Sequence, residues 1–256
     1  MAERFSSSRS FAAHDERVSL EGLEAFRAFA RDNSWAMSSE FATKIARYGE
    51  ENGAFSLFYG AHADDVVIDG TNWRETIVAH GLNARGRAVI DELAEWPSQA
   101  RILMLEAVTP FALAVRGRFP YAIGAEYLPT PQDRAAFFPI PHCDITRSDY
   151  PDGVFDAVVS NDVLEHVPNI EKAMRETRRL LKPGGICLAT FPFAPGQEES
   201  VTKAKIEGGQ VVHLMTPEYH GNPVDPQGSL VFAIPGWDIL STCKAVGFRS
   251  AEILFV

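Results

Sequence analysis

Apolar residues follow two different spacings along the chain, and the change falls near residue 101. Before it they recur every three or four positions, as on one face of an α-helix. The two series are Leu20, Leu23, Phe26 and Ala30, then Val89, Leu93 and Trp96. After it, short β-rich runs alternate with helix-length segments at 101–107, 121–127, 137–141, 155–160 and 185–192. Strands joined by such crossovers pair in parallel. The sequence therefore predicts an α/β fold, a doubly wound, mostly parallel Rossmann-like sheet with an N-terminal helical extension.

The most regular helical pattern spans residues 168–182. Its apolar stripe consists of Ile170, Ala173, Met174, Thr177, Leu180 and Leu181. Pro183 and Gly184 are expected to end the helix, because proline cannot continue the hydrogen-bond ladder and glycine accepts a positive φ. A second helix is predicted at 237–246, followed by a last strand at 251–256.

These patterns divide the chain into three predicted parts. Residues 1–16 are polar and Ser-rich and read as a flexible tail, residues 17–100 as a helical cap region, and residues 101–256 as the α/β domain. Within that domain, residues 194–228 are polar and rich in glycine and proline. A connection of this length is often a lid or a substrate-binding element, so we expect a lid or acceptor loop there.

Composition narrows the range of partners. The 256 residues carry a net charge of −10, which disfavours nucleic acids and anionic membranes. The chain has three isolated cysteines and no Cys-x-x-Cys pair, which indicates reduced thiols and no metal site. No apolar run approaches 18 residues, so we expect a cytoplasmic protein that does not span a membrane.

Candidate binding residues follow the predicted strands, because ligands of open parallel sheets bind at the carboxyl ends of the strands. Glu106 to Pro110 follow the first strand and Glu126 ends the second. A carboxylate at that second position commonly holds the two hydroxyls of a ribose. Asp144 follows the third strand, where it can accept an exocyclic amine while Ile145 packs on a purine. Asn161, Asp162, Glu165 and His166 follow the fourth.

Residues 101–192 resemble the class I S-adenosylmethionine-dependent methyltransferases, especially the type 11-like bacterial group. The resemblance rests on Phe155-Asp156-Ala157-Val158, Val163-Leu164-Glu165-His166 and Leu181-Lys182-Pro183-Gly184-Gly185. It implies transfer of a methyl group from S-adenosylmethionine to a small-molecule or glycan acceptor, most plausibly at oxygen. Such folds usually add a seventh, antiparallel strand. Here we expect Ser229–Ile234 to replace it, a shorter sheet, or a natural chain that continues past Val256. The oligomeric state stays open.

The resemblance also implies roles for individual residues. Glu106, Ala107 and Thr109 would wrap the carboxypropyl group of the cofactor, and Glu126 with Tyr127 would lie at the ribose. Asp144 and Ile145 would contact adenine. Ser160 and Asn161 would lie near the methionine moiety. The alternatives without a ligand are a surface acid at a strand end for Glu126, and the cap of a turn or helix for Asp144 and Asn161.

The loop after the first strand departs from the family. Where the family reads Asp/Glu-x-Gly-x-Gly-x-Gly, this chain reads Glu106-Ala107-Val108-Thr109-Pro110, without a glycine. Glu106 would repel the cofactor carboxylate unless it meets the ammonium group or turns away. One alternative is therefore a non-catalytic methyltransferase-like partner or regulator. An NAD-type oxidoreductase is disfavoured, because no Gly-x-Gly-x-x-Gly follows a strand.

Three histidines are candidates for chemistry. His166 is suited to removing a proton from a hydroxyl acceptor near neutral pH, although Glu165-His166 recurs in the group and can serve only to brace the loop. His213 and His220 lie in the expected lid and are candidate acceptor-site residues, against the alternative of a solvated loop.

Overall fold

The computed structural model describes residues 18–34, 66–68, 77–79, 82–83, 93 and 96–255. The chain consists of two compact units, residues 1–95 with 253–256, and residues 96–252. The tail predicted at 1–16 and the helical series that begins at Val89 fall largely outside the described residues.

In the first unit, the helical spacing after Leu20 produces helix α2 (Leu23–Asp32). Leu20 itself belongs to strand β1 (Val18–Leu20), which pairs antiparallel with β15 (Ile253–Phe255). The last predicted strand thus exists, but it pairs with β1 and not with the parallel sheet. This unit also contains a three-stranded antiparallel sheet with the order β2-β3-β4. Its strands are β2 (Val66–Ile68), β3 (Ile77–Ala79) and β4 (Leu82–Asn83).

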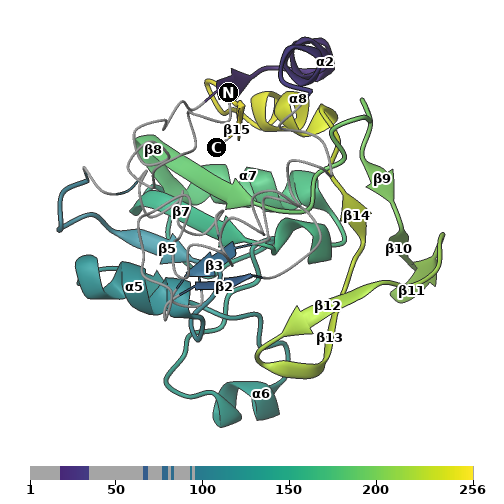
Figure 1. The fold of residues 1–256 in the computed structure, drawn as a ribbon. Helices are drawn as coiled ribbons and strands as arrows, with labels where there is room; N and C mark the ends of the chain where they lie inside the picture. Colours follow the sequence, from purple (N-terminus) through teal and green to yellow (C-terminus); the bar gives the residue numbers. More distant parts are fainter. Residues whose placement is uncertain are drawn as a thin grey trace. The chain divides into compact units, whose positions relative to one another are not determined.

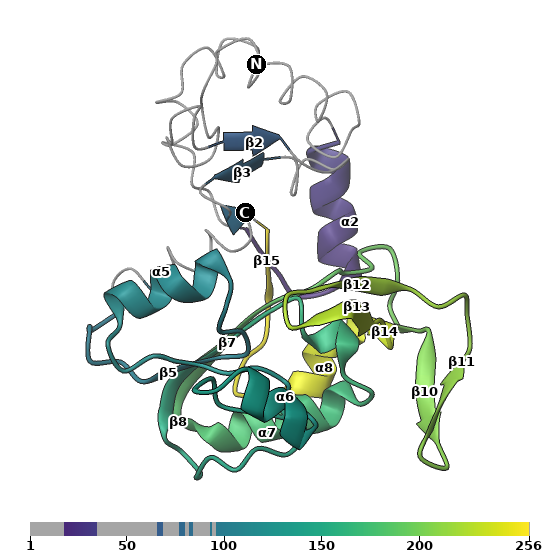
Figure 2. The same ribbon diagram turned by 90° about the horizontal axis from the view of Figure 1, so that it is seen from below.

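The second unit is built on a four-stranded parallel sheet with the order β6-β5-β7-β8. The strands are β6 (Ile123–Gly124), β5 (Ile102–Met104), β7 (Phe155–Asn161) and β8 (Leu181–Thr190). The apolar run of β5 is fully buried, as strands covered on both faces require. Figure 2 shows α5 on one face of the sheet, with α7 and α8 on the other. This arrangement confirms the predicted α/β class.

Several helices of this unit begin at a residue whose side chain caps the helix. The helices of the unit are α5 (Pro110–Arg118), α6 (Pro131–Ala136), the 3₁₀ helix η3 (Leu164–His166), α7 (Ile170–Leu180) and α8 (Asp238–Ala245). The side chain of Asn169 accepts a hydrogen bond from the Lys172 N–H and caps α7. The buried side of α7 includes Ala173, Met174 and Leu180. The prediction of this helix is confirmed, although it ends at Leu180, two residues before the predicted end.

The stretch after β8 is not an irregular loop, because much of it forms antiparallel pairs (Figure 1). Strand β10 (Ala204–Glu207) pairs with β11 (Gln210–His213), and β12 (Tyr219–Asn222) pairs with β13 (Asp225–Leu230). Strand β14 (Ala233–Ile234) pairs with β9 (Val201–Thr202). Residues Ser229–Ile234 therefore do not add a strand to the parallel sheet, which has four strands among the described residues.

The strand predicted at 137–141 is wrong. Pro139 and Pro141 have no N–H to donate to a ladder, and the side chain of Phe138 is exposed. Parallel pairing at this point is limited to an isolated bridge between Glu126 and His142. That bridge still sets the backbone of Pro141, His142 and Cys143 beside Glu126. The segment that was expected to follow a third strand therefore reaches the same edge of the sheet without forming one.

Candidate functional site

The strand order reverses between β5 and β7, which is where open parallel sheets bind ligands. From β5 the chain passes to β6 on one side and then returns to β7 on the other. The loop after β5 and the residues after β7 therefore meet at one edge. The Leu105 N–H donates to the Val159 carbonyl at 3.0 Å and extends the β5–β7 ladder up to the first residues of the loop.

Glu106 stands at the centre of this edge. One carboxylate oxygen accepts a hydrogen bond from the Asn161 amide at 2.8 Å, and the other accepts one from the Thr109 hydroxyl. The Thr190 hydroxyl donates to the amide oxygen of Asn161 at 3.1 Å, which orients the amide group. Burial raises the pKa of Glu106, with further increases from the charges of Glu126 and Asp162, against the two hydrogen bonds. Glu106, which was expected to repel the cofactor carboxylate, is thus held by a residue of its own loop and by the end of β7.

Thr109 explains how this loop is shaped without glycine. Its hydroxyl oxygen accepts a hydrogen bond from the Ala112 N–H at 3.2 Å and so caps α5. Pro110 opens the helix, where its missing N–H costs nothing. The Thr109 side chain therefore joins the helix start to Glu106, a role that the sequence alone did not reveal.

Glu126 closes the loop from the side of β6. Its carboxylate accepts a hydrogen bond from the Ala107 N–H at 2.7 Å, and the side chain is 8% exposed. Burial raises its pKa, although hydrogen bonds from the Ala107 and Val108 backbones oppose the increase. The loop passes so close to β6 that a Cβ at Gly124 would lie 2.9 Å from the Ala107 Cα and from the Glu106 carbonyl oxygen. The glycine that allows a close approach is therefore in β6 and not in the loop.

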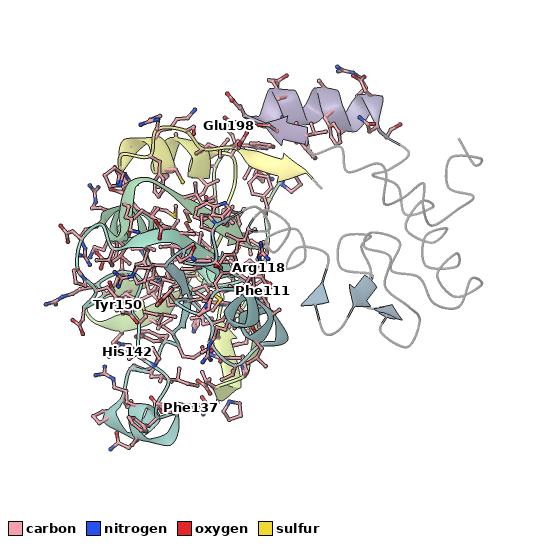
Figure 3. The ribbon with its side chains drawn as sticks, turned by 90° about the vertical axis from the view of Figure 1, so that its left-hand side faces the viewer. Phe111, Arg118, Phe137, His142, Tyr150 and Glu198 are labelled. Atoms are coloured by element: carbon pink, nitrogen blue, oxygen red, sulfur yellow. The ribbon has the colours of Figure 1, made fainter. Side chains whose placement is uncertain are left out.

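The remaining predicted cofactor residues lie after β6, near the bridge, and at the end of β7. Tyr127 is largely exposed, and its ring lies 5.7 Å, centroid to centroid, from the ring of His142 at a tilt of 48°; the place of His142 in the unit is marked in Figure 3. Asp144 caps a turn, since its Oδ1 accepts from the Thr146 N–H at 2.8 Å and from the Thr146 hydroxyl. Ile145 is buried. The hydroxyl of Ser160 is buried and has no hydrogen-bond partner among the described residues.

A second polar cluster lies beyond the end of β7 and consists of Glu165, His166 and His220. The Glu165 carboxylate is fully buried. Its Oε1 lies 3.6 Å from the Nε2 of His166 and 3.4 Å from the Nδ1 of His220. The two imidazole rings meet edge to face with centroids 5.0 Å apart. His213 is not part of this cluster and lies exposed at the end of β11.

The hydrogen bonds of the two rings fix where their protons lie. The Nδ1 of His166 is 2.9 Å from the Leu230 carbonyl, which only accepts, so this nitrogen donates. The Nε2 of His220 donates in the same way to the Glu218 carboxylate at 3.2 Å, and Lys203 forms an ion pair with that carboxylate. Burial lowers the pKa of His166, so the neutral ring is favoured. The inner nitrogen of each ring, Nε2 of His166 and Nδ1 of His220, faces the Glu165 carboxylate.

The β12–β13 hairpin is attached to η3 at this cluster. The Phe232 N–H donates to the Glu165 carbonyl at 2.7 Å, and the Val231 N–H donates to the Glu218 carbonyl at 2.9 Å. The stretch predicted as a lid therefore contacts the Leu164-Glu165-His166 motif directly. His220 was predicted as an acceptor-site residue, whereas nothing in the sequence indicated Leu230, whose carbonyl orients the His166 ring.

Comparisons with known proteins find methyltransferases. A family model described as a methyltransferase domain matches residues 123–189. An uncharacterized methyltransferase of Mycobacterium sp. (strain KMS) is 25% identical over 240 residues, 88% of this chain and 85% of the relative. An uncharacterized methyltransferase of Mycobacterium tuberculosis is 38% identical over 81 residues, 29% of this chain, and the chain spans 41% of its length. The structure of a sugar N-methyltransferase from Streptoalloteichus sp. ATCC 53650 is 22% identical, covers 64% of this chain and 78% of its own, and has a TM-score of 0.42.

Residues 123–189 match the model of a methyltransferase domain, and the relatives that align over most of the chain are methyltransferases, so the chain is similar to this class of enzyme. This similarity disfavours the NAD-type oxidoreductase considered above. It leaves open the acceptor and the atom that is methylated. None of the described helices is long and apolar enough to cross a membrane.

Proposed function

We propose that the chain binds S-adenosylmethionine at the edge formed by the ends of β5, β6 and β7 and methylates a hydroxyl group of a small-molecule or glycan acceptor. The observation that carries this proposal is the hydrogen bond from the Ala107 N–H to the Glu126 carboxylate. It fixes the first loop against a buried acid at the end of the second strand, the position suited to holding a ribose.

The residues at this edge suit the parts of the cofactor. A carboxylate with four lone-pair sites can keep the Ala107 hydrogen bond and still accept from two vicinal hydroxyls, which supports Glu126 as the ribose ligand. Glu106 would meet the ammonium of the methionine moiety, since two negative groups would repel one another. The buried Ser160 hydroxyl, with no partner among the described residues, supports a polar ligand there. Asp144 and Ile145 would contact adenine.

The histidine cluster is the proposed acceptor end of the site. When bound, the cofactor supplies a methyl group on a cationic sulfur, which becomes a neutral thioether as the methyl carbon bonds to the acceptor oxygen. His166 and His220, held by hydrogen bonds to Leu230 and Glu218, would contact the acceptor hydroxyl and assist the loss of its proton. The β12–β13 hairpin would close over the acceptor and exclude water. His213, exposed on β11, remains a weaker candidate for contacting a larger acceptor.

Incubation with methyl-labelled S-adenosylmethionine and matched sets of hydroxyl and amine acceptors tests this proposal. Labelled methyl ethers, found by mass spectrometry together with S-adenosylhomocysteine, are the expected products. Transfer only to amines would overturn the assignment to oxygen. Cofactor binding without transfer to any acceptor class would favour the non-catalytic alternative.

A further inference from the structure

We propose that Glu165, His166 and His220 form a binding site for one divalent transition-metal ion, with Zn²⁺ as the reference ion. No pattern in the sequence indicates such a site, because the chain has no Cys-x-x-Cys pair and the two histidines are 54 positions apart, too far for a recognisable motif. The fold brings them together when the β12–β13 hairpin packs on η3.

The spacing of the three donor atoms suits a metal ion. The candidate ligand atoms all lie within 4.8 Å of one another, and the carboxylate oxygen lies 3.6 and 3.4 Å from the two nitrogens. Zinc binds imidazole nitrogen and carboxylate oxygen at about 2.0–2.2 Å, so tetrahedral ligands lie about 3.4 Å apart. Two imidazoles and one carboxylate favour zinc or a neighbouring transition metal over Mg²⁺, which prefers oxygen ligands.

The outer hydrogen bonds of the histidines are the second, independent observation. His166 donates its outer N–H to a backbone carbonyl, and His220 donates its outer N–H to the Glu218 carboxylate. Metal-binding histidines are held in this way, with the remote nitrogen as donor and the inner lone pair toward the ion. Here the inner nitrogens of both rings face the same oxygen of a buried carboxylate, so three atoms of the kinds that zinc binds lie together.

Such an ion would leave at least one coordination position open, as catalytic metal sites do. This part of the inference rests on the proposed function: the open position would take the acceptor hydroxyl and ease the loss of its proton to water. The two histidines would then activate the acceptor through the ion and would not remove the proton themselves. Glu218 would be a positioning residue, acting through His220.

Metal binding is tested on the full chain after treatment with a chelator. Calorimetric titration with Zn²⁺ should show one ion per chain, and Co²⁺ should develop the visible absorption of a low-coordinate site that Zn²⁺ then abolishes. The variant His220→Gln should weaken Zn²⁺ binding by roughly 100-fold, and Glu218→Gln by about 10- to 100-fold. His213→Gln, an exposed histidine in the same stretch, is the matched control and should bind as the unmodified chain does.

Parallel titrations with S-adenosylhomocysteine verify that each variant is folded and separate the two proposals. Absence of stoichiometric Zn²⁺ binding to the unmodified chain would overturn the metal site, even where S-adenosylhomocysteine still binds. Equal Zn²⁺ affinity in His220→Gln and His213→Gln would overturn it as well. Metal binding without S-adenosylhomocysteine binding would instead contradict the proposed cofactor site.

Discussion

The Asn161 amide donates a hydrogen bond of 2.8 Å to the Glu106 carboxylate, joining the ends of the two strands between which the strand order reverses. A glycine-rich loop in this place leaves its backbone open to a ligand. Here side chains shape the loop, since Glu106, Thr109 and Asn161 hold one another and Glu126 binds the backbone from the opposite side. The loop without glycines is therefore held by side chains, and the carboxyl ends of β5 and β7 still meet at one edge of the sheet.

Replacing Glu106 by glutamine should change the pH dependence of stability. Burial raises the pKa of Glu106, so its contribution to stability is fully present below the ordinary value of 4.5 and is lost as the pH rises through the higher folded value. Glu106→Gln removes this loss. Its free energy of unfolding relative to the unmodified chain should therefore increase between pH 4 and pH 7, measured by urea denaturation. Glu171→Gln, at an exposed position on α7, is the control, and a parallel course of both variants would refute the buried-acid account.

Thr109→Ala should destabilise the chain by about 0.5–2 kcal/mol, the usual cost of losing a helix N-cap. The variant removes both the cap of α5 and the hydroxyl that donates to Glu106. Thr109→Ser keeps that hydroxyl and should stay close to the unmodified chain. Denaturant titration compares the three proteins, and equal losses for alanine and serine would show that the hydroxyl is not what matters.

Glu126→Gln should weaken S-adenosylhomocysteine binding while leaving the fold intact. The amide oxygen can still accept from the Ala107 N–H, but the charged acceptor for the ribose hydroxyls is lost. The expected penalty is about 1–3 kcal/mol, or roughly 5- to 150-fold in Kd. Calorimetry on Glu126→Gln and on the control Glu171→Gln measures it, and an unchanged Kd would show that Glu126 does not bind the cofactor.

The native cysteines should react slowly with thiol reagents at pH 8. Burial raises the pKa of Cys143 and Cys187 to about 12 and that of Cys243 to about 11. Since the thiolate is the reactive form, colour development with Ellman's reagent should be slow until urea unfolds the chain, when three thiols react. Fast reaction of Cys143 or Cys243 in the native chain would contradict the burial of these two thiols.

The sequence predicted well the elements whose pattern is local. The spacing of Ile170, Ala173 and Met174 indicated α7, and the buried run at Val158 indicated β7. It failed at 137–141, where an apolar run resembles a strand although its prolines prevent a ladder. It also missed the direct change from helix to strand at Leu181. Strand β8 begins there, before the proline and glycines that were expected to separate the helix from the strand.

The candidate site was predictable where it depends on strand ends, as for Glu106, Glu126 and Asn161. It was not predictable where it depends on pairing across long distances in sequence. Gly124 is needed because the β5 loop passes over it, and His220 reaches Glu165 only because the β12–β13 hairpin packs on η3. Neither relationship has a periodicity or spacing that a single sequence displays.

Calorimetric titration of the full chain with S-adenosylhomocysteine tests the central claim most directly, with NAD as the comparison ligand. The account predicts saturable binding of one S-adenosylhomocysteine per chain and no heat with NAD. Absence of S-adenosylhomocysteine binding to the folded chain would show that the edge between Glu106 and Glu126 does not hold the cofactor.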